Sequence, residues 1–320
     1  MNTSPLPVLY YYFYELLPHA PLNAKSGHEC RPGILLRSAE GGVACLQPWT
    51  ELGDHSLRDE IQALRNGSPL PLGRRALDCI HADAQARKEL RSLFSPEVSI
   101  PESHATLRAG IGEEELLSLH VRGFSTGKYK ATRNLTKIAE DLARFSAILP
   151  EWRWRIDFNG ILTPDEFLEV APLLQGISGN KIDFFEDPTP FDEALWLSWQ
   201  SKGIPIAVDW LPSGYTPSSP LPLKVWKPAS EVVNLSDASR WVVTSYMDHP
   251  IGQTWAAYEA SMLQLLNTSV DICGLATQDL YHPSAFSERL GPASPKFTPP
   301  CGTGLGFDDL LNTLPWKKLE

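Results

Sequence analysis

Short apolar runs with polar breaks between them recur along the last two thirds of the chain, and each run predicts a β-strand. Eight such runs follow one another: Ala105–Ala109, Phe124–Ala131, Arg153–Phe158, Ile182–Glu186, Ile204–Asp209, Leu221–Lys227, Trp241–Met247 and Asp271–Ala276. Eight strands are enough to close a barrel. The pattern therefore predicts an α/β barrel over residues 105–290.

Helical periodicity appears between several of these strands. The clearest helical stretches are Leu135–Leu149, Pro164–Leu174 and Thr254–Leu266. Asn134 and Thr163 stand where helix-capping residues are expected. Two connections are short, and the residues between Asp209 and Leu221 are rich in Pro, Ser and Gly. We expect an irregular loop there in place of a helix.

The first 104 residues have a mixed pattern that predicts a smaller α+β domain. It contains a strand, a loop, a strand pair and two helices, at Val8–Tyr14, Pro18–Gly33, Ile34–Leu46, Ser56–Asn66 and Gly73–Phe94. Ser95–Glu102, with two prolines, is the expected linker to the barrel. The tail Gly291–Glu320 is too irregular for a barrel helix, and we expect it to pack back on the first domain.

Ionisable residues stand at or near the C-terminal ends of five predicted strands: Lys130, Asp157, Glu186, Asp209 and Lys227. Catalytic groups of barrels gather at this end of the strands. Three carboxylates among oxygen donors favour a hard cation such as Mg²⁺. A lysine on either side of a metal-bound carboxylate substrate could remove the proton from the neighbouring carbon.

Residues two apart on a strand face the same side, which extends the predicted site inward. Lys128 then shares a face with Lys130, and Arg155 shares a face with Asp157. The same rule places Ile182 and Phe184 on the face of Glu186. Buried cations need partners, and the carboxylates are the expected ones.

Each of these residues also has an ordinary interpretation. A single carboxylate is more often solvated or a helix cap than a metal ligand. Lys227 could be a strand-end lysine that extends to water. The combination favours a site, because three strand-terminal carboxylates in succession, each after hydrophobic residues, are difficult to explain as surface charge.

Composition narrows the class of partner. The net charge is −10 and no dense Lys/Arg tract occurs, which argues against nucleic acid or an anionic membrane surface. The five cysteines form no Cys-x-x-Cys pair, and we expect reduced thiols. No Lys or Arg precedes Lys25 and Glu15 interrupts the first apolar stretch, so a signal peptide is not expected. These features predict a cytoplasmic enzyme for a small carboxylate substrate, with no obligate protein partner evident and its oligomeric state open.

Several motifs together resemble the enolase superfamily. They are Lys-Tyr-Lys at 128–130, Arg-Ile-Asp-Phe-Asn-Gly at 155–160, Phe-Glu-Asp-Pro at 185–188, Asp209 at a strand end and Lys-Pro at 227–228. Their spacing is most similar to that of the o-succinylbenzoate synthase family. The resemblance covers residues 105–290 and weakens in the first domain. It implies a modified (β/α)₇β barrel, related to the TIM barrel, under an N-terminal α+β capping domain.

The resemblance also implies roles for individual residues. Asp157, Glu186 and Asp209 would bind Mg²⁺, with Mn²⁺ as an alternative ion. Lys130 would abstract the proton α to the substrate carboxylate, giving an enediolate that the metal stabilises, and would return the proton to the departing hydroxyl. Lys227 would stay cationic on the opposite face, and Lys128 would lower the pKa of Lys130.

Other implied positions are supporting ones. Asn159 would be oriented toward the metal ligands and Arg155 toward the inner carboxylates, although turn and core-pair roles are as consistent with the sequence. The backbone N–H of Gly274 would meet the succinyl side of the substrate, and the loop His19–Gly27 would close over the site. The family's serine-rich seventh strand is here Ser245–Pro250, where only Ser245 remains as a candidate contact.

The implied reaction is the dehydration of 2-succinyl-6-hydroxy-2,4-cyclohexadiene-1-carboxylate to o-succinylbenzoate, a step of menaquinone biosynthesis. Alternatives within the superfamily are an N-succinylamino acid racemase or dipeptide epimerase and, with less support, a muconate cycloisomerase. The last strand has no Asp-x-Asp of the kind that dipeptide epimerases use. A barrel that has lost activity and only binds is the alternative from another class, and the retained buried charges argue against it.

Overall fold

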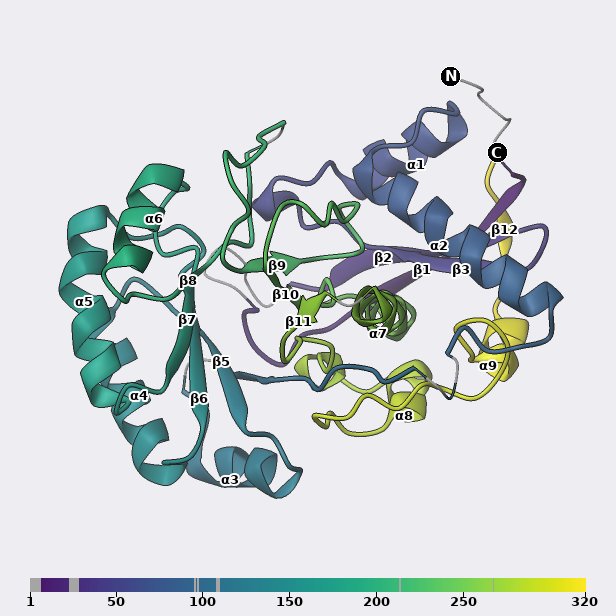
Figure 1. Ribbon diagram of the computed structural model, residues 1–320. Coiled ribbons are helices and arrows are strands. Elements are labelled where there is room, and N and C mark those ends of the chain that lie inside the picture. The colour runs from purple at the N-terminus through teal and green to yellow at the C-terminus, as the bar shows by residue number, and fades with distance from the viewer. Residues whose placement is uncertain are drawn as a thin grey trace.

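The computed structural model describes residues 7–22, 29–94, 96, 98–107, 110–212, 214–266 and 268–320. An antiparallel sheet with two helices lies on one side of the molecule, and a set of parallel strands wrapped by helices lies on the other (Figure 1). Each side has its own cluster of buried apolar side chains. The site described below lies where the two sides meet.

The N-terminal sheet has the strand order β12-β1-β2-β3, with β1 at Leu9–Leu16, β2 at Arg31–Ser38, β3 at Val43–Leu46 and β12 at Lys317–Lys318. A short 3₁₀ turn η1 (Thr50–Leu52) and the helices α1 (Leu57–Arg65) and α2 (Pro71–Lys88) follow it. Two predicted boundaries differ most from the structure. β2 begins inside the predicted loop Pro18–Gly33, and α2 ends at Lys88 rather than at Phe94.

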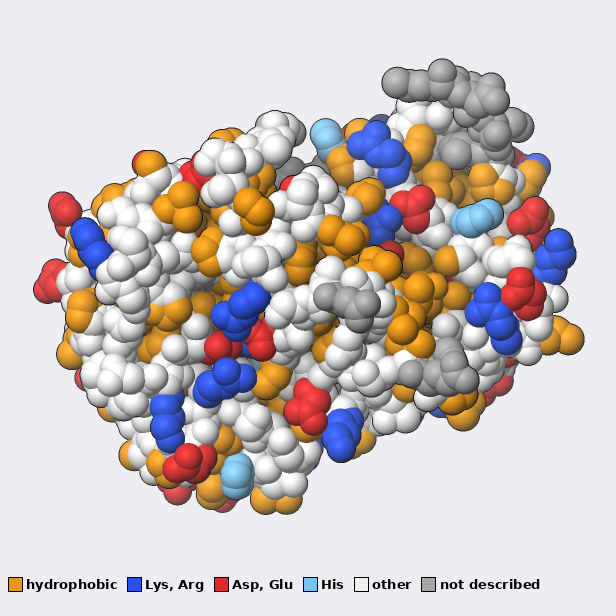
Figure 2. All heavy atoms as spheres, viewed as in Figure 1, with side chains coloured by type: hydrophobic (Ala, Val, Ile, Leu, Met, Phe, Trp, Pro, Cys, Tyr) orange, Lys and Arg blue, Asp and Glu red, His pale blue; other side chains and the backbone are white. Residues whose placement is uncertain are grey.

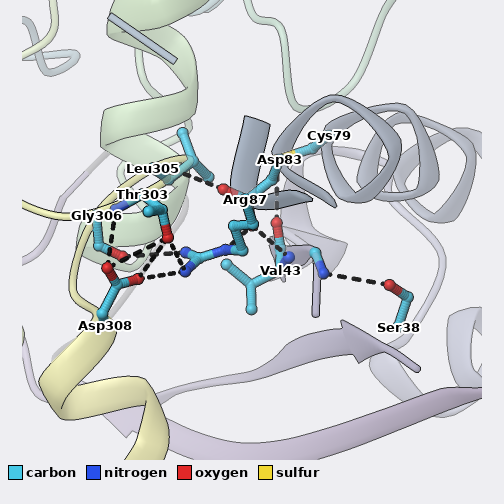
Figure 3. A network of polar contacts seen from close by, with 10 residues as sticks. Ser38, Val43, Cys79, Asp83, Arg87, Thr303, Leu305, Gly306 and Asp308 are labelled. Atoms are coloured by element: carbon cyan, nitrogen blue, oxygen red, sulfur yellow. Dashed lines mark hydrogen bonds and ion pairs between the residues drawn. The ribbon is translucent and has the colours of Figure 1, made fainter. Parts of the chain in front are cut away.

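The C-terminal tail returns to this sheet. After α8 (Ala285–Leu290) and α9 (Asp308–Thr313), β12 pairs antiparallel with β1. A buried carboxylate fixes the tail, because Asp83 of α2 accepts hydrogen bonds from the backbone N–H of both Val43 (2.8 Å) and Leu305 (2.6 Å). Arg87 connects Asp83 to Asp308 in the same network (Figure 3). Three distant segments of the chain are thereby held together.

Parallel strands form the second half. A five-stranded sheet contains β4 (Ala105–Leu107), β5 (Thr126–Lys130), β6 (Arg153–Asp157), β7 (Ile182–Glu186) and β8 (Ile206–Ala207). A three-stranded sheet contains β9 (Lys224–Trp226), β10 (Arg240–Val243) and β11 (Ser269–Val270). Single bridges join the two sheets on both edges, at Val208 with Lys224 and at Ser103 with Cys273. The strands therefore close into a barrel, as the sequence predicts.

Helices α3 (Glu113–Val121), α4 (Leu135–Ile148), α5 (Pro164–Ile177) and α6 (Glu193–Ser201) lie outside β4 to β8 (Figure 1). The predicted caps are present, since Asn134 accepts from Lys137 N–H and Thr163 forms a capping box with Glu166. Helix α7 (Pro250–Leu265) starts four residues earlier than predicted, with Pro250 in its first turn. In the described part of the chain no helix follows β8, as expected, and none follows β9.

A register shift between β6 and β7 corrects one facing prediction. Trp154 pairs with Ile182 but Arg155 pairs with Phe184, so Asp183 is an extra residue on β7. Ile182 therefore packs among the residues under the helices, whereas Phe184 packs inside the barrel. The period-two rule predicted that Ile182 faces the barrel interior, because the rule takes no account of an extra residue in the strand.

Charged side chains on the face drawn in Figure 2 are of both signs and interspersed, with apolar side chains between them. No helix within the described ranges combines the length and the apolar character needed to cross a membrane.

Candidate active site

The predicted ionisable residues gather at one end of the barrel. Lys130, Asp157 and Glu186 are the last residues of β5, β6 and β7, and the pairing register places each beside the next. Asp209 follows β8 and Lys227 follows β9 directly. Parallel neighbours that end together bring these side chains to one rim.

Ion pairs connect the lysines with the carboxylates. The ammonium nitrogen of Lys128 lies 2.6 Å from Glu186 Oε1 and 3.0 Å from Asp157 Oδ2. Lys130 Nζ lies 3.3 Å from the same Asp157 oxygen, and Lys227 pairs with Asp209. Three ammonium groups thus face three carboxylates, so the cluster compensates its own charge.

The pKa values of Asp157 and Glu186 are shifted in opposite directions. Burial alone would raise the pKa of Asp157, but the ammonium groups of Lys128 and Lys130 hold it well below its usual range. Burial and then the negative charge of Asp157 raise the pKa of Glu186 to about 7. Of these two carboxyl groups, Glu186 therefore holds its proton more readily.

The lysines differ as well. Burial lowers the pKa of Lys130, the Asp157 carboxylate offsets part of that effect, and the Lys128 ammonium lowers the pKa further. For Lys227, burial acts in the same direction, but the carboxylates of Asp209 and Glu186 outweigh it and raise the pKa. Lys128 is held well above its usual pKa because Asp157 and Glu186 outweigh its burial. Lys130 alone of these three is shifted toward the neutral amine.

Asp187 supports this rim and was missed as an individual residue. Its carboxyl oxygens accept hydrogen bonds from the backbone N–H of Asp209 (2.9 Å) and of Trp210 (3.1 Å). It has a positive φ of 39°, a conformation that few non-glycine residues adopt. Asp187 stands next to Glu186 in the Glu-Asp-Pro motif, which was the available signal. It positions the irregular chain that presents Asp209.

The supporting residues Asn159 and Arg155 have different surroundings. Asn159 lines the site cavity, has a left-handed φ of 51°, and donates its backbone N–H to Asp157 Oδ1 at 3.1 Å. Arg155, expected to be oriented toward the inner carboxylates, pairs with Asp183 Oδ2 at 2.7 Å. Asp183 is the bulge residue of β7. Arg155 therefore forms a buried ion pair that lies farther from the rim of the barrel than the proposed metal ligands.

The opposite side of the cavity is neutral. It is formed by His104, Thr106, Thr244, Ser245, Gly274 and Thr277. Ser245 Oγ lies 2.7 Å from Thr277 Oγ1. The role expected for the Gly274 N–H is contradicted, because this group donates to Val243 O at 2.8 Å within the barrel. Glycine is needed here for space, since a Cβ would lie 2.7 Å from Thr244 Cγ2 and 2.9 Å from His104 Cε1.

The N-terminal domain completes this neutral side. Trp49 and Leu52 line the cavity together with Tyr246 and Met247 of the barrel. The Trp49 indole N–H donates to Tyr246 O (2.8 Å), and Asp54 Oδ2 accepts from Tyr246 Oη (2.9 Å). The segment 245–250, which departs from the family pattern, is thus where the barrel contacts the cap. No sequence signal joined residues so far apart.

Two cavities meet at Thr106 and Lys130. The one between the charged and neutral sides has a volume of about 40 Å³. Its neighbour has a volume of about 340 Å³ and an apolar lining that includes Leu107, Leu119 and Phe124. His19–Leu22 of the loop expected to close over the site line this larger cavity, while residues 23–27 of that loop lie outside the described residues.

Asp157, Glu186 and Asp209 are the predicted ligands of a divalent cation. In the described part of the chain, no three His, Cys, Asp or Glu side chains are arranged to hold an ion as they stand. The ammonium groups of the lysines form ion pairs with the carboxylate oxygens instead. The donor set nevertheless suits a hard cation, because it consists of three carboxylates, and Glu186 Oε2 is buried without a hydrogen-bond partner. The residues fit the ion once the ammonium groups of Lys130 and Lys227 withdraw from Asp157 and Asp209.

Comparison with known proteins identifies relatives of the whole chain. Residues 9–86 match the family model described as the N-terminal domain of o-succinylbenzoate synthase. The o-succinylbenzoate synthase of Bdellovibrio bacteriovorus is 32% identical over 329 aligned positions, covering 96% of this chain and 97% of that protein. The alignment with this relative also covers the barrel, whereas the family model matches the N-terminal domain alone.

Solved structures show the fold. A dipeptide epimerase from Enterococcus faecalis V583, complexed with Mg and the dipeptide L-Leu-L-Tyr, superposes with a TM-score of 0.73 at 13% identity, covering 95% of this chain and 99% of that one. The muconate lactonizing enzyme of Pseudomonas fluorescens, complexed with muconolactone, superposes with a TM-score of 0.71 at 14% identity, covering 95% and 96%. The fold is that of the enolase superfamily, as the sequence predicts.

Proposed function

Since this chain belongs to the o-succinylbenzoate synthase family, we propose that it dehydrates 2-succinyl-6-hydroxy-2,4-cyclohexadiene-1-carboxylate to o-succinylbenzoate. It is then a carbon–oxygen lyase, and we place it in the cytoplasm as an enzyme of menaquinone biosynthesis. The observation that carries the proposal is the pair Lys130 and Lys227 at the two ends of a buried row of carboxylates. A proton can be removed from one side while positive charge is kept on the other.

Asp157, Glu186 and Asp209 would hold Mg²⁺, with Mn²⁺ as the alternative ion. When bound, the divalent cation supplies positive charge beside the substrate carboxylate oxygens, where negative charge grows as the proton leaves. The unpartnered Glu186 Oε2 and the all-carboxylate donor set support this assignment. Asn159 and Asp187 hold the chain around these ligands through the contacts with Asp157 and Asp209.

Lys130 is the proposed base. Its lowered pKa increases the fraction of free amine near neutral pH, which a base requires. It takes the proton from the carbon α to the carboxylate and then gives it to the departing hydroxyl, so that water leaves. Lys128 stays protonated between Asp157 and Glu186 and keeps positive charge beside Lys130.

Lys227 is the proposed electrostatic partner. Its raised pKa keeps it cationic, so it can stabilise developing negative charge from the opposite face without exchanging a proton. This division of roles separates dehydration from racemisation. In a racemase or epimerase both lysines must exchange protons.

Racemisation or epimerisation is the second candidate. It is supported by the fold shared with the Enterococcus faecalis dipeptide epimerase and by the two lysines in one site. The segment 271–276 reads Asp-Ile-Cys-Gly-Leu-Ala and has no second acidic residue for a substrate amine. We therefore keep N-succinylamino acid racemisation as a side activity to be measured.

The test is turnover of the cyclohexadiene substrate, followed by ultraviolet absorbance with Mg²⁺, with a chelator, and after Mg²⁺ is restored. We expect fast turnover that the chelator abolishes and the ion recovers. Racemisation of an N-succinylamino acid is measured on the same preparation. Absence of dehydration in a folded protein that binds Mg²⁺ would overturn the synthase assignment, and racemisation under those conditions would establish the second candidate.

A further inference from the structure

We propose that His104 is a substrate-binding residue that donates its Nε2–H to the ketone oxygen of the succinyl arm. The proposal rests on the proposed function for the identity of the substrate. His104 precedes β4, so it lies deeper in the barrel than Lys130. Its side chain lines the same cavity as Lys128, Lys130 and Lys227, although the residue is only 2% exposed.

The neighbouring arginine determines which ring nitrogen carries the proton. His104 Nδ1 lies 3.0 Å from Arg155 Nη1. A guanidinium group only donates hydrogen bonds, so Nδ1 must accept and cannot carry a proton. Burial opposes a positive charge on the ring and lowers the pKa of His104, and the nearby cation of Arg155 acts in the same direction. His104 is therefore a neutral imidazole with its proton on Nε2.

Arg155 is itself held in place, which makes it the positioning residue for this tautomer. Its Nε donates to Asp183 Oδ2 at 2.7 Å, and its Nη1 also donates to Ile272 O at 2.6 Å. The guanidinium stacks over Phe184, with its carbon 4.7 Å from the ring centre. Because Arg155 Nη1 is a fixed donor, His104 Nδ1 stays an acceptor.

The free edge of the imidazole faces Gly274. A Cβ at position 274 would lie 2.9 Å from His104 Cε1 and 3.0 Å from Nε2. The backbone N–H of Gly274 is used by Val243 O, and Gly274 O accepts from Ser245 N–H. Among the described residues, the His104 ring makes its hydrogen bond through Nδ1 to Arg155, and Nε2–H has no protein acceptor.

The chemistry of the substrate selects the acceptor. In the proposed mechanism, the ring carboxylate of the substrate binds beside the divalent cation, and the departing hydroxyl receives its proton from Lys130. The ketone of the succinyl arm is the neutral acceptor that remains, and a neutral imidazole N–H matches it. Because the product o-succinylbenzoate keeps this ketone, the contact is a binding contact and should affect KM more than kcat.

Two measurements test the proposal on the Mg²⁺-loaded enzyme. The first is the ¹⁵N spectrum of the histidine rings, with His104 identified by its absence in His104→Gln. We expect an unprotonated Nδ1 and a protonated Nε2 at neutral pH. A proton on Nδ1, or on both nitrogens at neutral pH, would overturn the proposal whether or not the variants fold.

The second is calorimetric binding of o-succinylbenzoate and of 2-(3-carboxypropyl)benzoate, in which a methylene replaces the ketone. We expect His104→Phe to weaken binding of the ketone ligand about tenfold and to leave the methylene ligand unchanged. His104→Gln, which keeps an N–H donor, should recover part of the loss. His120→Gln, on a helix outside the barrel, is the matched control and should change neither affinity.

Equal losses for both ligands in His104→Phe, or no loss for either, would overturn the ketone contact. The outcome is separable from the proposed function. If the unmodified enzyme dehydrates the cyclohexadiene substrate and the ketone-selective loss is absent, only this inference fails. If the unmodified enzyme shows no dehydration, the proposed function fails on its own measurement.

Discussion

The two sides of the site cavity are built differently. On the side formed by β5 to β9, lysines and carboxylates alternate and form ion pairs, as in the contacts of Lys128 with Asp157 and Glu186. The other side is formed by the cap, by His104 and Thr106 at β4, and by the chain from β10 onward. Its lining is neutral, and its polar groups are mostly bound to backbone or to hydroxyls. One side supplies charge for chemistry, and the other supplies shape and fixed donors.

Two buried aspartates show what this difference does. Asp157 has lysines around it, and its pKa is held well below the usual range. Asp248 lies behind the neutral side, no cation is among the groups that shift its pKa, and burial raises that pKa to about 7. The same side chain is thus a stable anion on one side and a group that favours its proton on the other.

The strongest test of the charged side is removal of its lysines. We expect Lys130→Ala and Lys227→Ala each to lower the dehydration rate by about 10³-fold or more, because the first removes the base and the second the opposing charge. Steady-state kinetics with the cyclohexadiene substrate measures this. Lys137→Ala, which changes a half-exposed lysine of α4, is the control and should keep full activity. Near-normal turnover in either site variant would refute its assigned role.

The pH dependence of stability tests the neutral side. The pKa of Asp248 is raised to about 7 in the folded protein. The contribution of this carboxyl group to the free energy of unfolding is therefore complete below its unfolded pKa of about 4, and it is lost as the pH rises through about 7. Relative to Asp248→Asn, the unmodified protein should lose up to about 4 kcal/mol of unfolding free energy between pH 4 and 8. Urea denaturation at several pH values measures the difference. Parallel pH profiles would show that Asp248 is not a buried, unpaired carboxyl.

A steric change tests how tightly the neutral side is packed. Gly274→Ala places a methyl group against Thr244 Cγ2 and the His104 ring, and we expect about 1–3 kcal/mol of destabilisation. Thr244→Ser removes the methyl group with the shortest contact, so the double variant should recover part of this loss. Urea denaturation of the two single variants and the double variant gives the answer. An unchanged stability in Gly274→Ala would mean that the packing is looser than described.

The smallest expected effect concerns the contact between the cap and the barrel. Tyr246→Phe removes the hydroxyl that donates to Asp54 while keeping the ring, and we expect a loss of about 1 kcal/mol with a few-fold rise in KM. In Asp54→Ala the same hydroxyl has already lost its acceptor, so adding Tyr246→Phe should cost little more. Fully additive effects in this double-mutant cycle would show that the two residues do not act together.

The charged side could be predicted from the sequence because its information is local. A strand of known length that ends in Lys130, Asp157 or Glu186 places that residue at the rim, whatever the rest of the fold does. Counting along the strand failed at the bulge residue Asp183. One extra residue moved Ile182 to the outer layer and gave Arg155 a partner that period-two counting did not suggest.

The neutral side could not be predicted in the same way. Trp49 and Tyr246 meet across almost two hundred positions, and their contact uses a backbone carbonyl that has no sequence signature. His104 gains its role from Arg155, on a strand that is not adjacent to it. Gly274 was recognised as a special position for the wrong reason, since its N–H is used inside the barrel and only its missing side chain matters.

The central claim is that the lysine–carboxylate cluster opens to admit a divalent cation and substrate between Lys130 and Lys227. A crystal structure of the enzyme with Mg²⁺ and o-succinylbenzoate tests it most directly. We predict the ion on Asp157, Glu186 and Asp209, with the ammonium groups of Lys130 and Lys227 on opposite faces of the ring, about 3–4 Å from the carbon that carries the carboxylate. An ion bound elsewhere, or both lysines on one face of the ring, would contradict the account.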